Sequence, residues 1–333
     1  VDPRTGERIG PDTGDPRKAA SFDDLMAMFR GQMKHFVDVK VRGNHAIERL
    51  YATRMPAPFL SVLVDDCIAR GKDYHAGGAR YNTTYIQGVG LGTVTDALAS
   101  LRHHVFRSDL SNGQREARME ALLQALATNF ADAPTLRGDL IHRTPKFGND
   151  DEAADEVMRL VFETYHGLVD GRKNTRNGRY HVDLLPTTCH VYFGSVTGAT
   201  ADGRLAGEPL SEGISPVQGA DRNGPTAVIR SAARLDHSRT GGTLLNLKFS
   251  PSALRGDEGI ARLRDLIRAY FRLGGHHLQF NVVSADTLRE AQRDPQKHRD
   301  LIVRVAGYSD YFCDLTTALQ NEIIARTEHE AVA

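Results

Sequence analysis

The chain has 333 residues, of which 40% are hydrophobic and 25% charged, a composition typical of a globular protein that buries a sizeable core. Lys and Arg together number 42, as do Asp and Glu, so the formal net charge is zero. This balance does not favour a nucleic-acid or membrane-surface partner. No stretch of the sequence approaches the roughly 18 apolar residues of a transmembrane helix.

Three cysteines stand far apart, at Cys67, Cys189 and Cys313. An odd, scattered set argues against a disulfide framework and predicts a reducing, cytoplasmic setting. No Cys-x-x-Cys pair is present, so we expect no zinc or iron–sulfur site in this chain. The first residues, Val1 to Gly6, lack Met and the apolar core of a signal peptide, and they suggest a chain cut from something longer.

In the first half, apolar residues recur at helical spacing. After a Gly- and Pro-rich loop, Ser21 can cap a helix together with Asp24, three residues later. We expect this helix to run to about Thr53, and a second to run from about Ala57 to Ala69 and end at Gly71. Residues 73–92 are rich in glycine and should not form regular helix. Further helices are predicted over residues 94–105, 115–129 and 151–168.

From Tyr180 onward, short apolar or alternating segments are separated by helical ones, a pattern that predicts an α/β architecture. We therefore expect a mainly helical part, residues 1–175, and a strand-bearing part, residues 176–333, with no flexible linker between them. The predicted strands are His181–Leu185, His190–Phe193, Thr243–Phe249, His277–Val283 and Leu301–Val305, and the predicted helices are Glu258–Leu273, Ala285–Arg293 and Leu315–His329.

The most informative segment reads Arg304-Val-Ala-Gly307-Tyr-Ser-Asp-Tyr-Phe. A predicted strand leads into this glycine, and a helix ending in Ile-Ile-Ala-Arg326-Thr follows it. For an arbitrary glycine, the simplest explanation is a turn in which the residue adopts a positive φ.

This string closely resembles the signature of glycyl radical enzymes, R-V-x-G-[YF]-[ST] followed by a helix ending in I-x-R-T. The resemblance covers nearly the whole chain and implies the C-terminal half of a ten-stranded α/β barrel of the glycyl radical enzyme type, with a largely helical N-terminal portion. It also implies a glycyl radical domain over about residues 225–333 and a radical stored on Gly307. The other segments that carry it are 73–82 with its Gly-Gly-Ala-x-Tyr-Asn, 144–150, 198–204 and 241–246.

The chemistry implied by the resemblance requires glycine. Loss of a hydrogen atom from Cα leaves a radical that the adjacent amide nitrogen and carbonyl delocalise, and only a residue without Cβ becomes planar there without steric conflict. Because such a radical reacts with oxygen, we expect Gly307 to be buried on a packed loop. The flanking residues are apolar or aromatic, as that burial would need: Val303, Val305, Tyr308, Tyr311 and Phe312.

The resemblance also implies a catalytic cysteine on a second loop, in a Cys-x-Glu pattern whose glutamate acts as a general base. No Cys-x-Glu occurs in this chain. Cys67 and Cys313 are expected to be structural, whereas Cys189 has a claim to the wall of an active site. We therefore expect a fragment that begins just after the catalytic cysteine and is inactive alone.

Candidate substrate-pocket residues lie in two places. One group follows a predicted strand, where the resemblance puts the mouth of a barrel; hydroxyl groups satisfied within a turn are the alternative. The other group alternates along a predicted strand and so shares one face, which either points into a barrel or holds neighbouring loops. The candidates are Thr187, Thr188, Cys189 and His190 in the first group, and Gln279 and Asn281 in the second.

Within the superfamily, segments such as 187–194 and 211–219 look most similar to the branch that contains trans-4-hydroxyproline dehydratase and glycerol dehydratase. The reaction implied is radical elimination of water from a small hydroxylated substrate. The formate acetyltransferase, choline lyase and isethionate lyase branches stay open, as does a non-catalytic radical-bearing subunit.

The resemblance implies no bound cofactor. The radical at Gly307 would be installed by a separate activating enzyme that uses S-adenosylmethionine and an iron–sulfur cluster. The other implied partners are the N-terminal part of the same enzyme, a second copy in a full-length homodimer, and a small-molecule substrate.

Overall fold

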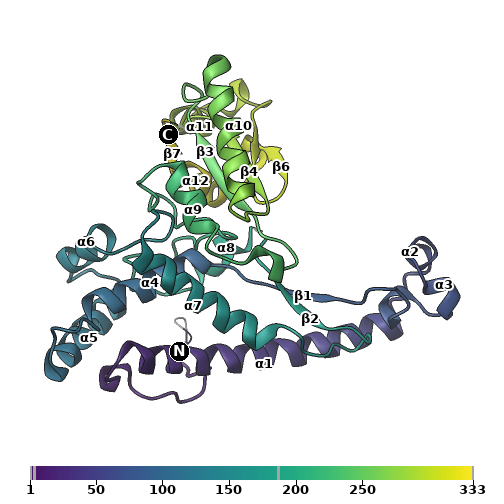
Figure 1. Cartoon of the computed structure of the whole chain (residues 1–333), viewed down its shortest axis with the longest axis horizontal. Coiled ribbons are helices and arrows are strands. Elements are labelled where there is room, and N and C mark those ends of the chain that lie inside the picture. Colours follow the sequence, from purple (N-terminus) through teal and green to yellow (C-terminus); the bar gives the residue numbers. More distant parts are fainter. Residues whose placement is uncertain (1, 3–4, 186–187, 332–333) are drawn as a thin grey trace.

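The computed structural model describes residues 2, 5–185 and 188–331 of the chain. Long helices form the base of the molecule (Figure 1). A smaller mixed unit, residues 243–331, stands on this base; we call it the C-terminal unit and the rest of the described chain the body. Among the described residues, no helix is both long enough and apolar enough to cross a bilayer.

The first helix, α1 (Phe22–Arg54), is 33 residues long and begins as the sequence predicts. Ser21 accepts a hydrogen bond from the backbone N–H of Asp24, and the Asp24 carboxylate accepts one from the backbone N–H of Ser21, which completes a capping box. The helix runs along the base of the molecule and ends far from the C-terminal unit (Figure 1).

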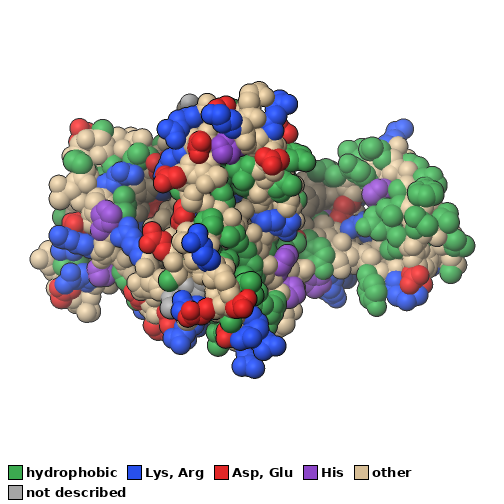
Figure 2. All heavy atoms as spheres, turned by 90° about the horizontal axis from the view of Figure 1, so that it is seen from above, with side chains coloured by type: hydrophobic (Ala, Val, Ile, Leu, Met, Phe, Trp, Pro, Cys, Tyr) green, Lys and Arg blue, Asp and Glu red, His purple; other side chains and the backbone are tan. Residues whose placement is uncertain are grey.

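Beyond α1 the predicted helix 57–69 is wrong as a single element. The chain forms α2 (Pro58–Leu63) and α3 (Cys67–Arg70), separated at Asp66, whose φ of 75° no helix can contain. Gly71 ends α3 at a φ of 58°, as predicted. These short helices form an arm that carries exposed apolar side chains (Figure 2): Met55, Phe59, Val62, Leu63 and Ile68.

Most of the remaining helices lie where the sequence predicts them. The predicted helices over 94–105, 115–129 and 151–168 are confirmed within a few residues, whereas α6 and α9 were not predicted. The bounds are α4 (Leu91–His104), α5 (Asn112–Ala127), α6 (Pro134–His142), α7 (Glu152–Val169), α8 (Cys189–Ser195), α9 (Pro225–Ala232), α10 (Gly256–Arg272), α11 (Ala285–Arg293) and α12 (Thr317–Ala325).

The strand predicted at His190–Phe193 is wrong, because these residues lie in α8. A four-residue apolar run is too short for its period to separate strand from helix. In the structure His190 and Gly194, four residues apart, are both buried on one side of the helix. The predicted helix 315–329 is also too long, since it ends at Ala325 and a short strand follows.

Parallel strands dominate the sheets, as an α/β architecture requires. Strand β3 pairs in parallel with β4 and with β7, and β1 pairs in parallel with β2. A parallel bridge between Leu184 and Thr243 continues β2 towards β3. Only the β5–β6 pair is antiparallel among the described strands. The bounds are β1 (Thr84–Gln87), β2 (Tyr180–Asp183), β3 (Leu245–Phe249), β4 (Leu278–Val282), β5 (Ile302–Arg304), β6 (Ser309–Tyr311) and β7 (Glu328–His329).

Two apolar cores hold these elements. The larger core joins α4 and α7 to β2 and β3, with Leu98, Val161, Val182 and Leu247 among its buried members. The smaller core lies in the C-terminal unit and gathers residues of α11, β5 and α12 around Phe312. The segment that carries Gly307 therefore belongs to a unit with a core of its own.

The backbone of Lys72 approaches Gly78 closely, within the glycine-rich segment. A Cβ on Gly78 would meet the backbone carbonyl of Lys72, so Gly78→Ala should lower the free energy of unfolding by about 1–3 kcal/mol. A Cβ on Gly167, within α7, would meet nothing within 4 Å, so Gly167→Ala should raise stability by up to about 1 kcal/mol. Urea unfolding of both variants measures the contrast, and equal effects would contradict the close approach at Gly78.

Candidate functional site

Gly307 lies at the tip of the β5–β6 hairpin. The register pairs Arg304 with Ser309, and the backbone N–H of Val305 donates to the carbonyl of Tyr308 at 2.8 Å, which closes a two-residue turn. Gly307 has a φ of 87° in this turn, a conformation that strains any residue with a Cβ. The turn expected from the bare sequence is thus present, and glycine is required for it.

Some of the residues that flank Gly307 are buried, and others are exposed. Val303, Val305 and Phe312 are buried in the small core, as predicted. Gly307 itself is exposed in this chain, and Tyr308 is 43% exposed. The residues of this chain thus leave the tip uncovered: alternate side chains of β5 face the core, whereas the turn projects beyond it. Burial of Gly307 in a longer enzyme stays a prediction.

Side chains of β4 hold one side of the hairpin by contacting Arg304. Asn281 donates from Nδ2 to the carbonyl of Arg304 at 2.7 Å, and its Oδ1 accepts from the backbone N–H of Arg304 at 2.8 Å. Gln279, on the same buried face of β4, lies with Oε1 at 3.4 Å from the Arg304 guanidinium. Both predicted pocket residues of β4 therefore contact the strand that leads to Gly307.

Helix α12 holds the other side through Arg326, the residue that directly follows it. The guanidinium donates from Nε and Nη2 to the two carboxylate oxygens of Glu322 at 3.0 and 2.8 Å. It also donates from Nη2 to the carbonyl of Val305 at 2.9 Å. Arg326 and Glu322 are 9% and 2% exposed, so this pair is buried with charge compensated within it.

Glu322 is also the point where α12 meets the body of the protein. Its Oε1 accepts from Gln218 Nε2 at 3.0 Å and lies 3.4 Å from His190 Nε2. Burial alone would raise the pKa of Glu322, but Arg326 and His190 outweigh it and hold that pKa well below its usual range. The partners of Glu322 therefore favour its ionised form.

A second buried carboxyl group, Glu212, lies in the same cluster and behaves in the opposite way. Its Oε1 accepts from Ser215 Oγ at 2.7 Å and Asn246 Nδ2 at 2.6 Å. Burial raises the pKa of Glu212, and the charge of Glu322 adds to this, although Arg326 opposes both. Two carboxyl groups in one cluster are thus pushed apart in pKa by their surroundings. We call Glu212, Glu322, Arg326, His190 and Gln218 the polar cluster.

Lys248 lies on β3 beside this cluster and is 2% exposed. Its Nζ donates to the carbonyl of Ile324 at 2.9 Å, in the last turn of α12, where the helix leaves carbonyl groups without partners. Burial lowers the pKa of Lys248 from 10.5 to about 8. A single lysine therefore ties β3 to the helix that positions Arg326.

The other predicted pocket residues fall around the start of α8. Thr187 lies outside the described residues. Thr188 is the N-cap residue of α8, and Cys189, its first residue, is exposed. His190 is fully buried against Glu322. His190 is thus linked to the hairpin through Glu322 of the polar cluster.

The two remaining cysteines are packed. Cys67 is 2% exposed in α3. Cys313 directs Sγ towards the carbonyl of His298 at 3.3 Å, and burial raises the pKa of its thiol. Within the described part of the chain, no group of three or more His, Cys, Asp or Glu side chains is arranged to hold a metal.

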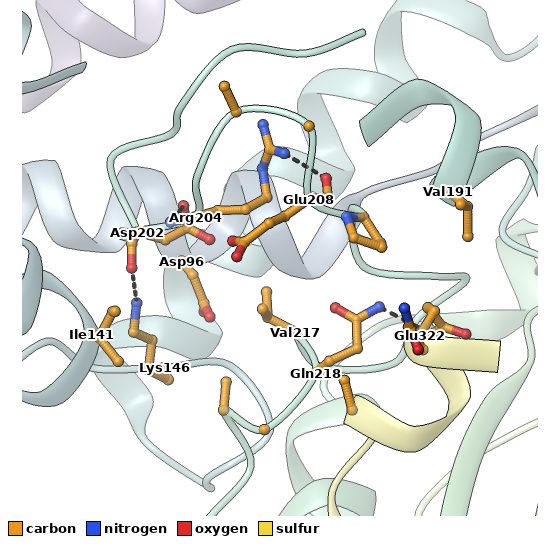
Figure 3. A pocket seen from close by; sticks show the side chains of 18 of the residues that line it. Asp96, Ile141, Lys146, Val191, Asp202, Arg204, Glu208, Val217, Gln218 and Glu322 are labelled. Carbon is orange, nitrogen blue, oxygen red and sulfur yellow. Dashed lines mark hydrogen bonds between the residues drawn. The ribbon is translucent and has the colours of Figure 1, made fainter. Parts of the chain in front are cut away.

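A cavity of about 770 Å³ lies between α12 and the loop that contains Asp202 (Figure 3). Lys146 donates to the backbone carbonyl of Asp202 at 3.1 Å on one side, and Gln218 and Glu322 lie on the other. Burial raises the pKa of Asp96, at the cavity wall, to about 7. Among the described residues, none of the predicted pocket candidates lines this cavity.

Sequence reasoning missed Glu212, Gln218, Glu322 and Lys248. A signal existed for Glu322, because it stands four residues before Arg326, the spacing of an ion pair on one helix face, among apolar neighbours. Glu212 and Lys248 offered none, since Glu212 meets Asn246 and Lys248 meets Ile324, which both come from segments remote in sequence.

Lys248 provides a pH prediction. Between pH 8 and 10.5 the unfolded chain holds a proton on this lysine that the native chain has lost, so stability should rise with pH over this window. Wild type should gain up to roughly 3 kcal/mol relative to Lys248→Met across it. Urea unfolding of both proteins at pH 8 and near pH 10 tests this, and parallel pH profiles would contradict it.

Comparison with known families places the chain. A family model described as pyruvate formate lyase-like matches residues 1–194, and one described as glycine radical matches residues 210–313. Together they cover most of the chain, including the hairpin.

Relatives and solved structures agree with these models. The trans-4-hydroxy-L-proline dehydratase of Clostridioides difficile is 50% identical over 98% of this chain and 41% of its own length. The (2S)-3-sulfopropanediol dehydratase of Klebsiella oxytoca is 36% identical over 97% of this chain and 39% of its own length. The crystal structure of the C. difficile hydroxyproline dehydratase with bound substrate matches at a TM-score of 0.94. The match spans 99% of this chain and 41% of that structure's chain. The B12-independent glycerol dehydratase of Clostridium butyricum, with glycerol bound, is 41% identical and covers 98% of this chain, which covers 41% of it, at a TM-score of 0.92. The chain thus spans about two-fifths of the length of these relatives.

Proposed function

The chain belongs to the pyruvate formate lyase-like family of glycyl radical enzymes, and from this premise we propose that it is the C-terminal portion of a dehydratase that stores its radical on Gly307. The observation that carries the proposal is the β5–β6 hairpin: a two-residue turn that demands glycine, inside the segment matched by the glycine radical model. The reaction would be radical elimination of water from a small hydroxylated substrate.

The chemistry of Gly307 follows from its position. One hydrogen atom leaves Cα for the radical that a separate S-adenosylmethionine and iron–sulfur activating enzyme provides, and the spin spreads over the flanking amide and carbonyl. Because such a radical reacts with oxygen, the protein would work anaerobically; we place it in the cytoplasm.

The rest of the proposed enzyme is absent from these 333 residues. The likeness to the hydroxyproline dehydratase structure, at a TM-score of 0.94 over 41% of that structure, supports one part of a larger enzyme of the same fold. The family resemblance implies one half of a ten-stranded barrel, with the catalytic Cys-x-Glu loop in the N-terminal part. The apolar arm at α2 and α3 supports the same assignment, because exposed apolar patches of this kind mark interfaces. We propose that the N-terminal part covers it and that the full-length enzyme is a homodimer.

The substrate pocket would be completed by the predicted residues near α8 and β4. Thr188 and Cys189, at the start of α8, are the more accessible of the described candidates. His190 and Asn281 are engaged with Glu322 and with the backbone of Arg304, which favours a supporting part for them.

The first test is anaerobic activation of the protein, followed by electron paramagnetic resonance. Wild type should give a glycyl radical signal, and Gly307→Ala should give none. Gly274→Ala is the matched control, because Gly274 also has a positive φ, 92°, and a Cβ there would meet nothing within 4 Å. It should keep the signal. A signal that persists unchanged in Gly307→Ala would contradict the assignment.

The second test concerns the substrate. Identity of 50% to the hydroxyproline dehydratase, against 37% to an isethionate sulfite-lyase of Oleidesulfovibrio alaskensis, favours the hydroxyproline dehydratase branch. A hybrid that joins the N-terminal part of the C. difficile relative to this chain should, once activated, consume trans-4-hydroxyproline. Turnover of isethionate, choline or pyruvate in its place would assign the protein to another branch.

A further inference from the structure

We propose that Arg326 is a positioning residue that clamps the glycine hairpin from α12 and thereby fixes the turn in which Gly307 lies. This inference deepens the proposed function and rests on it only for its radical readout. The clamp consists of three parts: the Arg326 guanidinium, the Glu322 carboxylate that orients it, and the Val305 carbonyl that receives it.

The hairpin has few polar ties to its surroundings near the turn. Asn281 bonds both backbone groups of Arg304, and Arg326 bonds the carbonyl of the next residue, Val305. Gln320 donates to the carbonyl of Phe312 at 2.9 Å, at the other end of the hairpin. Of these contacts, the one from Arg326 is the nearest to Gly307 in sequence.

The Val305 contact acts directly on the turn. The backbone N–H of Val305 closes the turn by donating to Tyr308, and its carbonyl accepts from Arg326. Both polar groups of this residue are therefore engaged, one within the hairpin and one to α12. These two bonds hold the peptides on either side of Val305. The second of them, between Val305 and Ala306, adjoins the Ala306–Gly307 peptide, which is one of the two peptides over which a radical at the Gly307 Cα would delocalise.

Glu322 gives the clamp its direction and its link to the body. The carboxylate binds Nε and Nη2 of the same guanidinium, the planar fork that arginine supplies and lysine does not. Gln218 and His190, from outside the C-terminal unit, approach the same carboxylate. The geometry of the hairpin tip is thus linked through one ion pair to a loop and a helix of the body.

The test that needs no radical is hydrogen exchange measured by mass spectrometry on the protein as purified. In Arg326→Gln, amides of a peptide over residues 301–312 should exchange about ten-fold faster than in wild type, while a peptide from α7 should not change. Arg326→Lys should not restore protection, because a lysine keeps the charge without the fork. Glu322→Gln should reproduce the effect, and the double variant should add little to either single one.

Arg204→Gln is the matched control. Arg204 is 6% exposed and donates to the backbone carbonyls of Leu205 and Glu208, but it lies in the body and not against the hairpin. It should lose stability without a selective change in peptide 301–312. If Arg326→Gln leaves that peptide at wild-type rates, or accelerates it no more than the α7 peptide, the clamp is overturned.

The radical readout separates the two proposals. In activated protein, Arg326→Gln should broaden the glycyl signal and shorten its lifetime several-fold, whereas Arg204→Gln should not. An unchanged line shape and lifetime in Arg326→Gln would overturn the positioning role. If wild type itself gives no signal, the proposed function fails, and the exchange comparison still decides whether Arg326 clamps the hairpin.

Discussion

The buried pair of Glu322 and Arg326 is the interaction on which the geometry around Gly307 depends. Two opposite charges four residues apart are almost completely buried. Each charge offsets the free-energy cost of removing the other from water. Removal of one partner from such a pair costs about 3–5 kcal/mol, because the remaining charge stays buried. The carbonyl of Val305, the side chain of Gln218 and the ring of His190 all take their places around this pair.

The small core stabilises the interior of the C-terminal unit, and the polar cluster helps to attach the unit to the body. Apolar side chains of α11, β5 and α12 pack around Phe312 and give the unit its internal order. Its attachment to the body uses a hydrogen bond from Gln218 to Glu322 as well as the parallel bridge between Leu184 and Thr243. Polar contacts fix direction more sharply than apolar ones, since hydrogen bonds weaken steeply with angle. The polar contacts are therefore suited to fixing the orientation of the hairpin.

Gly307 satisfies two separate demands with one missing side chain. The turn requires a positive φ, and the proposed radical requires a Cα that can flatten. Either demand alone would select glycine, so the residue type by itself does not distinguish them. The match of the surrounding segment to the glycine radical family supports the proposed radical as the second demand.

The sequence by itself determined the family, the α/β class, the capped first helix, most later helices and the strand that leads to Gly307, because each rests on a local period or motif. It did not determine α8, where a short apolar run suits helix and strand equally, or the break at Asp66. Only the tertiary structure decided that Gly307 projects beyond its core. It also decided that Asn281 and Arg326 meet the hairpin from opposite elements and that Glu212, Glu322 and Lys248 gather beside them. Those contacts join segments up to about a hundred residues apart, and no local pattern records which buried charges will find one another.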